Sequence, residues 1–469
     1  MRPPSSPAAV GLDLGTTRIK AGLLDERGRL QQVRSVPSPE LVGEDGIREA
    51  DPRAYARAAR ELVESTDVPS GTPLGIASQR STFTIWEREG ERLRLPLISW
   101  QDRRAAGWCD RHRSIEPEVV RRTGLPLSGH YAGPKLAALQ QAQPGLREEL
   151  RSGEWVFGTL ETYLIQQWTA GRIRETDLTM AARTLMLDLE RADWSPELLA
   201  HYDVPATILP RLVSSTGAGH DLAFGLRLEA MLSDQAAGLV AALDGSRRSA
   251  LVNLGTGAFV LRPTAGPQPR RLGYLTAPIL GTAGAEPRYC LEGTINGAGP
   301  ALDRFGPGPV ELPEKDPCRD GFALPDLAGL GSPHWRPQLG LTLSPAAREL
   351  PRPEQRRVVL EGLLFRIREL LEDLFDGRRP ERIVLAGGLT REPAVGEGLA
   401  AALGRPVELQ LERESGILGA ARLAAGLDPF ASSPTSPVEP GERGAYLREK
   451  FDRWTGWFGR LLSPRREDR

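Results

Sequence analysis

The sequence contains few cysteines. Only Cys109, Cys290 and Cys318 occur among its 469 residues, and no pair of them has the CxxC spacing of a metal or redox motif. Structural zinc sites need clustered cysteines or histidines, and secreted domains stabilised by disulfides need paired cysteines. The sequence therefore predicts no structural zinc site, and it fits a protein of the reducing cytoplasm.

Long apolar runs and an excess of charge of either sign are also missing. No stretch approaches the length of a membrane span, and residues 1–7 lack the apolar core of a secretory signal. The net charge is −1, with 26% charged residues, which is not typical of a protein that binds nucleic acid. We expect a cytoplasmic protein with no membrane partner and no nucleic-acid partner.

The common nucleotide-binding signatures are absent as well. The sequence has no GxxxxGK[ST] motif, and no GxGxxG motif follows its first predicted strand. These absences exclude a P-loop protein and a dinucleotide-binding Rossmann domain. A nucleotide could bind only through some other arrangement.

Such an arrangement is suggested by a turn that occurs twice. Gly15-Thr16-Thr17 joins two apolar segments near the N-terminus, and Gly255-Thr256-Gly257 joins two more about 240 residues later. Glycine lets backbone N–H groups approach a phosphate closely, and threonine adds hydroxyl donors. Lys20 could add positive charge, and Asp13 could orient Mg²⁺, which prefers oxygen ligands. Either copy alone is more often an ordinary hairpin turn, but the pair predicts a nucleotide clamp.

The alternation of predicted strands and helices indicates an α/β protein of more than one domain. A helix is predicted over residues 51–66 and another over 353–375, and residues 75–78 and 82–86 read as adjacent strands around a polar turn. We expect domains over residues 8–245 and 246–430.

A linker at 431–437 and a terminal amphipathic helix are predicted to complete the chain to residue 469. The helix carries an aromatic stripe that favours docking on the core, with a membrane anchor as the alternative. The stripe comprises Tyr446, Phe451, Trp454, Trp457 and Phe458.

Motifs along almost the whole chain resemble the FGGY carbohydrate kinases, and they are most similar to the glycerol kinase branch. They appear in the family's order, which no single motif could guarantee. The matching segments are residues 11–17, 78–82, 98–104, 123–126, 133–136, 157–164, 176–184, 233–237, 291–293, 329–335 and 416–421.

The resemblance implies two actin-like ATPase (ribonuclease H-like) domains with a cleft between them. In that cleft ATP, with Mg²⁺, would phosphorylate a hydroxyl group of a small sugar or polyol, and the protein could form a homodimer. Asp234 would be the general base; read without the resemblance, it is also a helix N-cap candidate. The other implied site residues are Arg80, Ser81, Trp100, His130, Gln235 and Phe259 for the acceptor, Thr16, Thr17, Lys20, Gly255, Thr256, Gly299, Gly387 and Gly388 for the nucleotide, and Asp13 for the metal.

The sequence departs from the glycerol kinase pattern at the acceptor. Ser81 stands where glycerol kinases carry Glu, and His130 where they carry a substrate-facing Tyr. Without that carboxylate, glycerol fits the pattern poorly, and a longer polyol or a ketose fits it better. Asp303 and Glu392 replace a Gln and an Asn near the nucleotide, which leaves nucleotide preference open, and the segment between Asp303 and Phe322 is unusually short.

These departures motivate an alternative, a catalytically weak sugar-binding or regulatory protein on the same scaffold. A third possibility, an actin-like filament or chaperone ATPase, is disfavoured because it would have no use for Arg80, Trp100 and Asp234 together.

Overall fold

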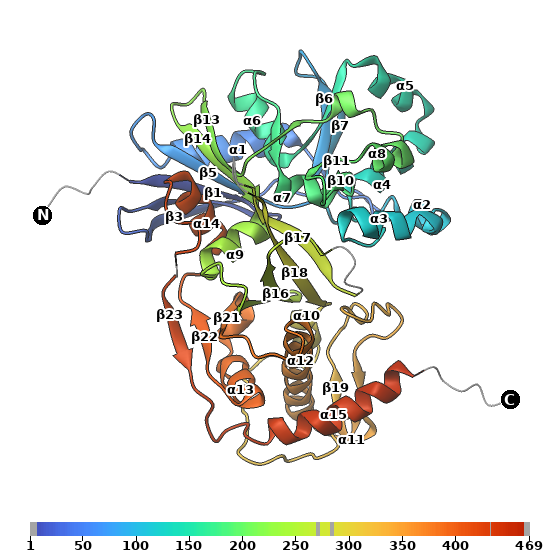
Figure 1. The fold of residues 1–469 in the computed structure, drawn as a ribbon, viewed down its shortest axis with the longest axis vertical. Helices are drawn as coiled ribbons and strands as arrows, with labels where there is room; N and C mark the ends of the chain where they lie inside the picture. The colour runs from blue at the N-terminus through green and yellow to red at the C-terminus, as the bar shows by residue number, and fades with distance from the viewer. Residues whose placement is uncertain (1–6, 269–272, 282–285, 432, 464–469) are drawn as a thin grey trace, which may run out of the picture.

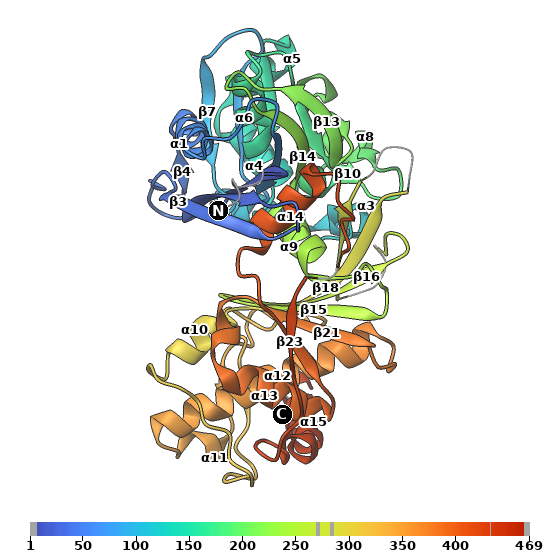
Figure 2. The same ribbon diagram turned by 90° about the vertical axis from the view of Figure 1, so that its left-hand side faces the viewer.

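The computed structural model describes residues 7–268, 273–281, 286–431 and 433–463. The chain forms two α/β halves stacked along the long axis of the molecule, each built on its own large sheet (Figure 1). Helices α9 (Asp234–Ala242) and α14 (Ser415–Ala424) lie at the waist between the halves, as both views show (Figure 2).

The first half is organised around a six-stranded sheet with the order β13-β14-β5-β1-β2-β3. Strands β1, β2 and β3 form an antiparallel meander, whereas β5 and β14 run parallel to β1. The strands span Ala9–Leu14 (β1), Arg18–Leu24 (β2), Leu30–Pro37 (β3), Pro73–Ser78 (β5), Thr216–Asp221 (β13) and Arg227–Ser233 (β14).

The first predicted turn closes the hairpin of β1 and β2. Leu14 pairs with Ile19 at its base, so Gly15, Thr16 and Thr17 project beyond the sheet. Helix α1 (Pro52–Glu64) confirms the helix predicted over residues 51–66, and Asp51 caps it by accepting from the backbone N–H of Arg53.

The prediction that residues 75–78 and 82–86 form adjacent strands is wrong. Residues 75–78 belong to β5 of the large sheet, whereas β6 (Phe83–Glu87) lies in a separate four-stranded sheet with the order β4-β7-β6-β8. Ser81, with a φ of 61°, lies in the turn between the two strands, and β6 pairs with β7 and β8 instead. The other strands of this sheet are β4 (Glu49–Ala50), β7 (Leu93–Ile98) and β8 (Trp155–Thr159).

Helices and short strands surround these two sheets. The helices are α2 (Ala106–Arg111), α3 (Glu116–Thr123), α4 (Ala132–Ala142), α5 (Pro144–Ser152), α6 (Leu160–Trp168), α7 (Leu178–Ala181) and α8 (Pro196–Tyr202). The short strands are β9 (Glu175–Asp177), β10 (Leu187–Asp188), β11 (Asp193–Trp194) and β12 (Arg211–Val213).

The second half repeats the strand plan of the first. Its seven-stranded sheet has the order β17-β18-β16-β15-β21-β22-β23, in which β15, β16 and β18 are antiparallel and β21 and β22 run parallel to β15. The second predicted turn closes the β15–β16 hairpin, as the first closes β1–β2. The strands are β15 (Ser249–Leu254), β16 (Ala258–Thr264), β17 (Leu275–Leu280), β18 (Arg288–Ile295), β21 (Arg382–Ala386), β22 (Val407–Gln410) and β23 (Thr435–Val438).

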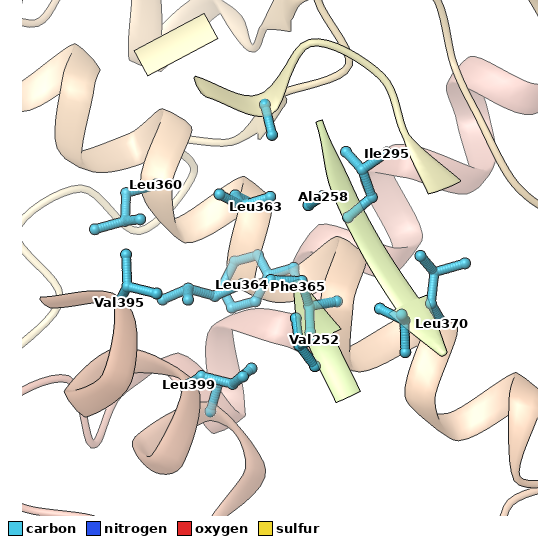
Figure 3. Packing of buried hydrophobic residues seen from close by; sticks show 14 of the residues in the cluster. Val252, Ala258, Ile295, Leu360, Leu363, Leu364, Phe365, Leu370, Val395 and Leu399 are labelled. Atoms are coloured by element: carbon cyan, nitrogen blue, oxygen red, sulfur yellow. The ribbon is translucent and has the colours of Figure 1, made fainter. Parts of the chain in front are cut away.

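Helix α12 (Arg352–Leu374) forms the centre of the second core, where the sequence predicts a helix over 353–375. Its apolar side chains share one core cluster with residues of β15, β18 and α13 (Pro393–Leu403), among them Val252, Ile295 and Val395, which Figure 3 shows around the helix. The remaining elements are α10 (Ala298–Asp303), β19 (Ala323–Leu324), β20 (Thr342–Leu343) and α11 (Pro345–Arg348).

The segment predicted to be a linker, residues 431–437, contributes to a strand of the second sheet. Residues 435–438 form β23, which pairs with β22 at the sheet edge; Ser432 lies outside the described residues. Helix α15 (Leu447–Leu462) then crosses the base of the second half (Figure 1). Its aromatic residues are buried in the core of that half. The aromatic stripe therefore docks on the core. No helix among the described residues has the length and apolarity needed to cross a membrane.

We predict that Trp454→Ala lowers the free energy of unfolding by about 3–5 kcal/mol, the usual cost of removing a large buried aromatic ring. The Trp454 side chain is fully buried, and its indole N–H donates to the carbonyl of Ala323 at 2.9 Å. Chemical denaturation would measure the change. Val42→Ala, a substitution of an exposed apolar residue, serves as the control. A loss no larger than that of the control would contradict the docked position of α15.

Candidate active site

Two cavities open between the halves. The first, which we call the Asp13 cavity, has a volume of about 260 Å³ and takes residues from both sheets. Asp13 reaches it from β1, and Asn253 occupies the equivalent hairpin position on β15. The two hairpins therefore face a common space. The cavity is lined by Asp13, Lys20, Asp234, Gln235, Gly238, Leu251, Asn253, Leu261, Ala386, Arg413, Glu414, Ser415 and Gly416.

The second, the Trp100 cavity, has a volume of about 470 Å³. Aromatic side chains from both halves form part of its walls, among them Trp100 from the first half and Phe259 and Trp335 from the second. Its lining comprises Thr16, Gln79, Arg80, Trp100, Pro126, Ser128, His130, Tyr131, Arg183, Asp234, Gln235, Phe259, Leu275, Glu292, Thr294, Asn296 and Trp335.

Asp234 and Gln235 line both cavities. Asp234 is the first residue of α9, which Ser233 caps by accepting from the backbone N–H of Ala236. The N-cap of α9 is therefore Ser233, and the interpretation of Asp234 as the N-cap is wrong. The side chain of Asp234 remains 39% exposed, and burial of its surroundings raises its carboxyl pKa, an effect that Arg80 opposes. This carboxyl group can contact ligands in either cavity.

Asp13 presents an unsatisfied carboxylate. Its Oδ1 atom is buried and has no hydrogen-bond partner among the described residues. Burial raises the carboxyl pKa, the nearby Asp234 adds to this effect, and Lys20 opposes it, which together bring the pKa to about 7. Lys20 itself is paired with Glu414, at 2.6 Å between Nζ and Oε2. A buried acidic oxygen without a partner is a suitable ligand for a hard cation such as Mg²⁺.

The second turn lies beside the other predicted nucleotide residues. The backbone N–H of Gly299 donates to the Thr256 carbonyl at 3.3 Å, and a side chain on Gly299 would press against the carbonyl of Gly255. Gly387, with a φ of 95°, lies so close to Asn253 that a Cβ atom there would be 2.7 Å from its Oδ1. These glycines from three segments therefore cluster at the end of β15.

Arg80, Trp100 and His130 come together in the Trp100 cavity. The indole N–H of Trp100 donates to the Thr16 hydroxyl at 2.8 Å, which ties this wall to the first turn. The Trp100 and His130 rings lie 5.4 Å apart. Burial lowers the pKa of His130 to about 3, with Lys135 and Arg80 adding to the effect, so its imidazole is neutral near pH 7.

Other predicted residues are placed differently. Ser81 is fully buried, does not line the Trp100 cavity, and donates to the Arg183 carbonyl at 2.9 Å. The structure therefore gives no support to its predicted contact with the acceptor, because its hydroxyl is used inside the fold. Thr17 is exposed at the tip of the first turn, and Gly388 faces open space at the start of a short helix.

The sequence analysis missed several residues that the structure brings to the site. Glu292 and Arg183 line the Trp100 cavity, and Asn253 and Glu414 line the Asp13 cavity. Glu292 and Arg183 are charged residues within the apolar stretches of two matching segments, 291–293 and 176–184. A charged residue in a predicted core element is the signal that could have identified them.

Asp13 is the residue predicted to contact the metal ion. Among the residues that the structure describes, no group of three or more His, Cys, Asp or Glu side chains could hold a metal ion. Mg²⁺ in kinases usually keeps several waters and is held by one or two carboxylates together with substrate phosphates. The single unpartnered carboxylate of Asp13 fits that pattern.

The comparison with protein families identifies the class. Residues 8–229 match the N-terminal domain model of the FGGY family of carbohydrate kinases, and residues 310–426 match the C-terminal domain model. The chain belongs to the FGGY family of carbohydrate kinases. It is an ATP-dependent kinase that phosphorylates a sugar or polyol, and the predicted fold class of two actin-like domains is confirmed.

Individual relatives agree with this assignment. The chain is 32% identical over 481 residues to a glycerol kinase of Alkalilimnicola ehrlichii, which covers 95% of this chain and 97% of that protein. A glycerol kinase structure from Plasmodium falciparum with ADP aligns with a TM-score of 0.83 and 19% identity, covering 97% of this chain and 98% of that one. A gluconate kinase from Lactobacillus acidophilus aligns with a TM-score of 0.81 and 20% identity over 97% and 98%. The fold alone therefore does not define the acceptor.

We predict that Asp13 makes the protein less stable as the pH rises. The pKa of Asp13 is 3.8 in its ordinary state and about 7 in the fold, so between these values the folded state holds the extra proton. Stability is therefore lost from about pH 4 to pH 7, by at most about 4 kcal/mol. Asp13→Asn should abolish this loss.

Chemical denaturation at pH 5 and at pH 8, in the presence of a metal chelator, would measure how the free energy of unfolding depends on pH. Asp13→Asn should gain stability relative to the parent at pH 8, while Glu26→Gln, which alters an exposed carboxylate in the turn between β2 and β3, should follow the parent. An identical pH dependence in the parent and Asp13→Asn would contradict the prediction.

Proposed function

We propose that Asp234 is the general base of the phosphoryl transfer. The observation that carries this proposal is its position on the wall shared by the Asp13 cavity and the Trp100 cavity. An acceptor hydroxyl in one cavity and a γ-phosphate in the other would meet at this carboxylate. Burial raises its pKa, which makes the group a better proton acceptor than an exposed aspartate.

The phosphates of ATP are proposed to bind between the two hairpin turns. The backbone N–H groups of Thr16, Thr17 and Thr256 and the hydroxyls of Thr17 and Thr256 would supply donors. Gly255 would let the backbone of the second turn approach the phosphates closely, and Lys20 would supply positive charge. Gly299, Gly387 and Gly388 are proposed to approach the nucleoside on the side of the second half. The clustering of Gly299 and Gly387 around the second turn supports a continuous nucleotide surface there.

In the proposed step the acceptor hydroxyl oxygen attacks the γ-phosphorus. Its proton passes to Asp234, the bond between the γ-phosphorus and the bridging oxygen breaks, and ADP leaves with the electron pair. Most catalysis of this kind comes from alignment and charge stabilisation. Arg80 and Gln235 would orient the hydroxyl, while Trp100 and Phe259 would cover the carbon skeleton.

Asp13 is proposed to hold Mg²⁺, directly or through water. The bound ion would neutralise charge on the phosphates during transfer. The unpartnered Oδ1 atom of Asp13 supports this assignment, and Lys20 is held beside it by Glu414.

The acceptor is proposed to be a neutral polyol or ketose longer than glycerol. Two guanidinium groups, Arg80 and Arg183, face two carboxylates, Asp234 and Glu292, so the charges of the Trp100 cavity balance. His130 is neutral near pH 7 and leaves the cavity uncharged on that side. An uncharged acceptor with several hydroxyl groups therefore matches these walls better than a sugar acid does.

The cytoplasm is the compartment we propose for this activity, since ATP is available there and the three cysteines are free in the structure. Assembly into a homodimer remains a prediction from the family resemblance.

We predict that Asp234→Asn lowers kcat by about 10²- to 10⁴-fold, because the amide cannot accept the hydroxyl proton. Binding of Mg²⁺ and ATP should change by less than about twofold, since the phosphate turns are intact. Initial rates of ADP release and calorimetric titration would provide the two values. Asp221→Asn, which alters an aspartate of the same half with a side chain 82% exposed, serves as the control. Near-parental turnover by Asp234→Asn would remove Asp234 from the role of base.

We predict that five- and six-carbon polyols and ketoses give a higher kcat/KM than glycerol. The Trp100 cavity, at about 470 Å³, has room for a longer chain, and the charges of its walls balance. A panel of polyols, ketoses and aldoses assayed for ATP consumption would test this. A clear preference for glycerol would overturn the proposed acceptor class. If none of the acceptors in the panel led to ATP consumption, the catalytically weak alternative would be supported.

A further inference from the structure

A carboxylate from the second half reaches the acceptor side of the cleft. Glu292 lies on β18, and its Oε2 atom accepts from Nη2 of Arg183 at 3.1 Å. The same Oε2 is 3.8 Å from Nη1 of Arg80. Both arginines belong to the first half, so Glu292 connects the halves beside the Trp100 cavity.

These groups form a row of alternating charge. Asp234 is 3.7 Å from Arg80, measured from Oδ1 to Nε; Arg80 is followed by Glu292, and Glu292 by Arg183. The side chains of Glu292 and Arg183 are only 3% and 5% exposed, and that of Arg80 is 17% exposed. Water therefore does little to screen the charges at the buried end of the row.

The two guanidinium groups depend on the carboxylate between them. Burial lowers the pKa of Arg80, Arg183 lowers it further by repulsion, and Glu292 acts in the opposite direction. Without Glu292 the two arginines would repel each other at short range with no carboxylate between them, and Asp234 would be the remaining partner of Arg80. Arg80 would then turn toward Asp234 or toward solvent.

Arg183 is itself fixed in place. The buried hydroxyl of Ser81, the residue next to Arg80, donates to the Arg183 carbonyl at 2.9 Å. Ser81 thus holds together the two segments that carry the arginines. Two of the residues that line the Trp100 cavity carry carboxylates: Asp234 comes from the first half and Glu292 from the second.

We propose that Glu292 is a positioning residue for phosphoryl transfer: it holds the Arg80 guanidinium in the orientation that binds the acceptor beside Asp234. The acceptor site is therefore completed by a carboxylate from the second half. This inference rests on the proposed roles of Arg80 and Asp234, and it adds a residue that acts through Arg80 without serving as base or metal ligand.

The test compares Glu292→Gln with Glu361→Gln. Glu361 is a matched control because it is also a buried glutamate of the second half, where it pairs with Arg357 and Lys450 in the core. Both substitutions remove a buried charge, so both should lower the melting temperature. Only Glu292→Gln should raise the KM for the best acceptor, by about tenfold or more, with the KM for ATP changed by less than about twofold.

A double-mutant cycle with Arg80→Gln separates positioning from general loss of structure. If Glu292 acts through Arg80, the double variant should have about the same acceptor KM as Arg80→Gln alone. Glu292→Asp, which retains the charge, should raise the KM less than Glu292→Gln and provides a second variant if the latter does not fold.

Two outcomes would overturn the inference while the parent remains active. One is an acceptor KM in Glu292→Gln equal to that in Glu361→Gln, and the other is an additive loss in the double variant. A parent protein that phosphorylates none of the panel would instead refute the proposed function, so the two failures can be told apart.

Discussion

The site depends on the backbone-to-backbone packing of two waist helices against each other and against the first sheet. Helix α14 contacts β1, β5 and α9, and at several glycines its backbone approaches theirs too closely to leave room for a side chain. A Cβ atom on Gly75 would overlap the Ala420 carbonyl, and one on Gly419 would overlap the Ala237 carbonyl. Because these glycines let the elements touch, Asp13 at the end of β1 and Asp234 at the start of α9 come to line one cavity.

This packing also explains why the two halves act together. Helix α14 follows the last parallel strand of the second sheet, yet it is buried against the first, and the shared cluster includes Ala77, Leu251 and Leu418. The same arrangement brings Glu292 within reach of Arg80 and Arg183. Charges that would be costly to bury singly are thus paired across the boundary between the halves, where the chemistry is proposed to occur.

The sequence predicted the parts of the molecule that depend on local pattern. The two Gly-Thr hairpins, α1 and α12 follow from turn chemistry and apolar periodicity, and the order of motifs led to the family. The pairing of β6 could not be predicted, since β5 and β7 flank it at similar distances along the chain and its other partner, β8, lies far from it in the sequence. The burial of the Ser81 side chain and the position of Glu292 beside the cavity could not be predicted for a similar reason. Both depend on contacts with Arg183, which lies about 100 residues from each in the sequence.

One nucleotide is proposed to be held between the two hairpin turns. Hydrogen–deuterium exchange with a non-hydrolysable ATP analogue and Mg²⁺ tests it most directly, because backbone N–H groups are the proposed phosphate donors. We predict slower exchange in peptides covering both residues 13–20 and residues 253–259, with a smaller effect around 385–391. Protection confined to one of the two turns, or found only elsewhere, would contradict the clamp.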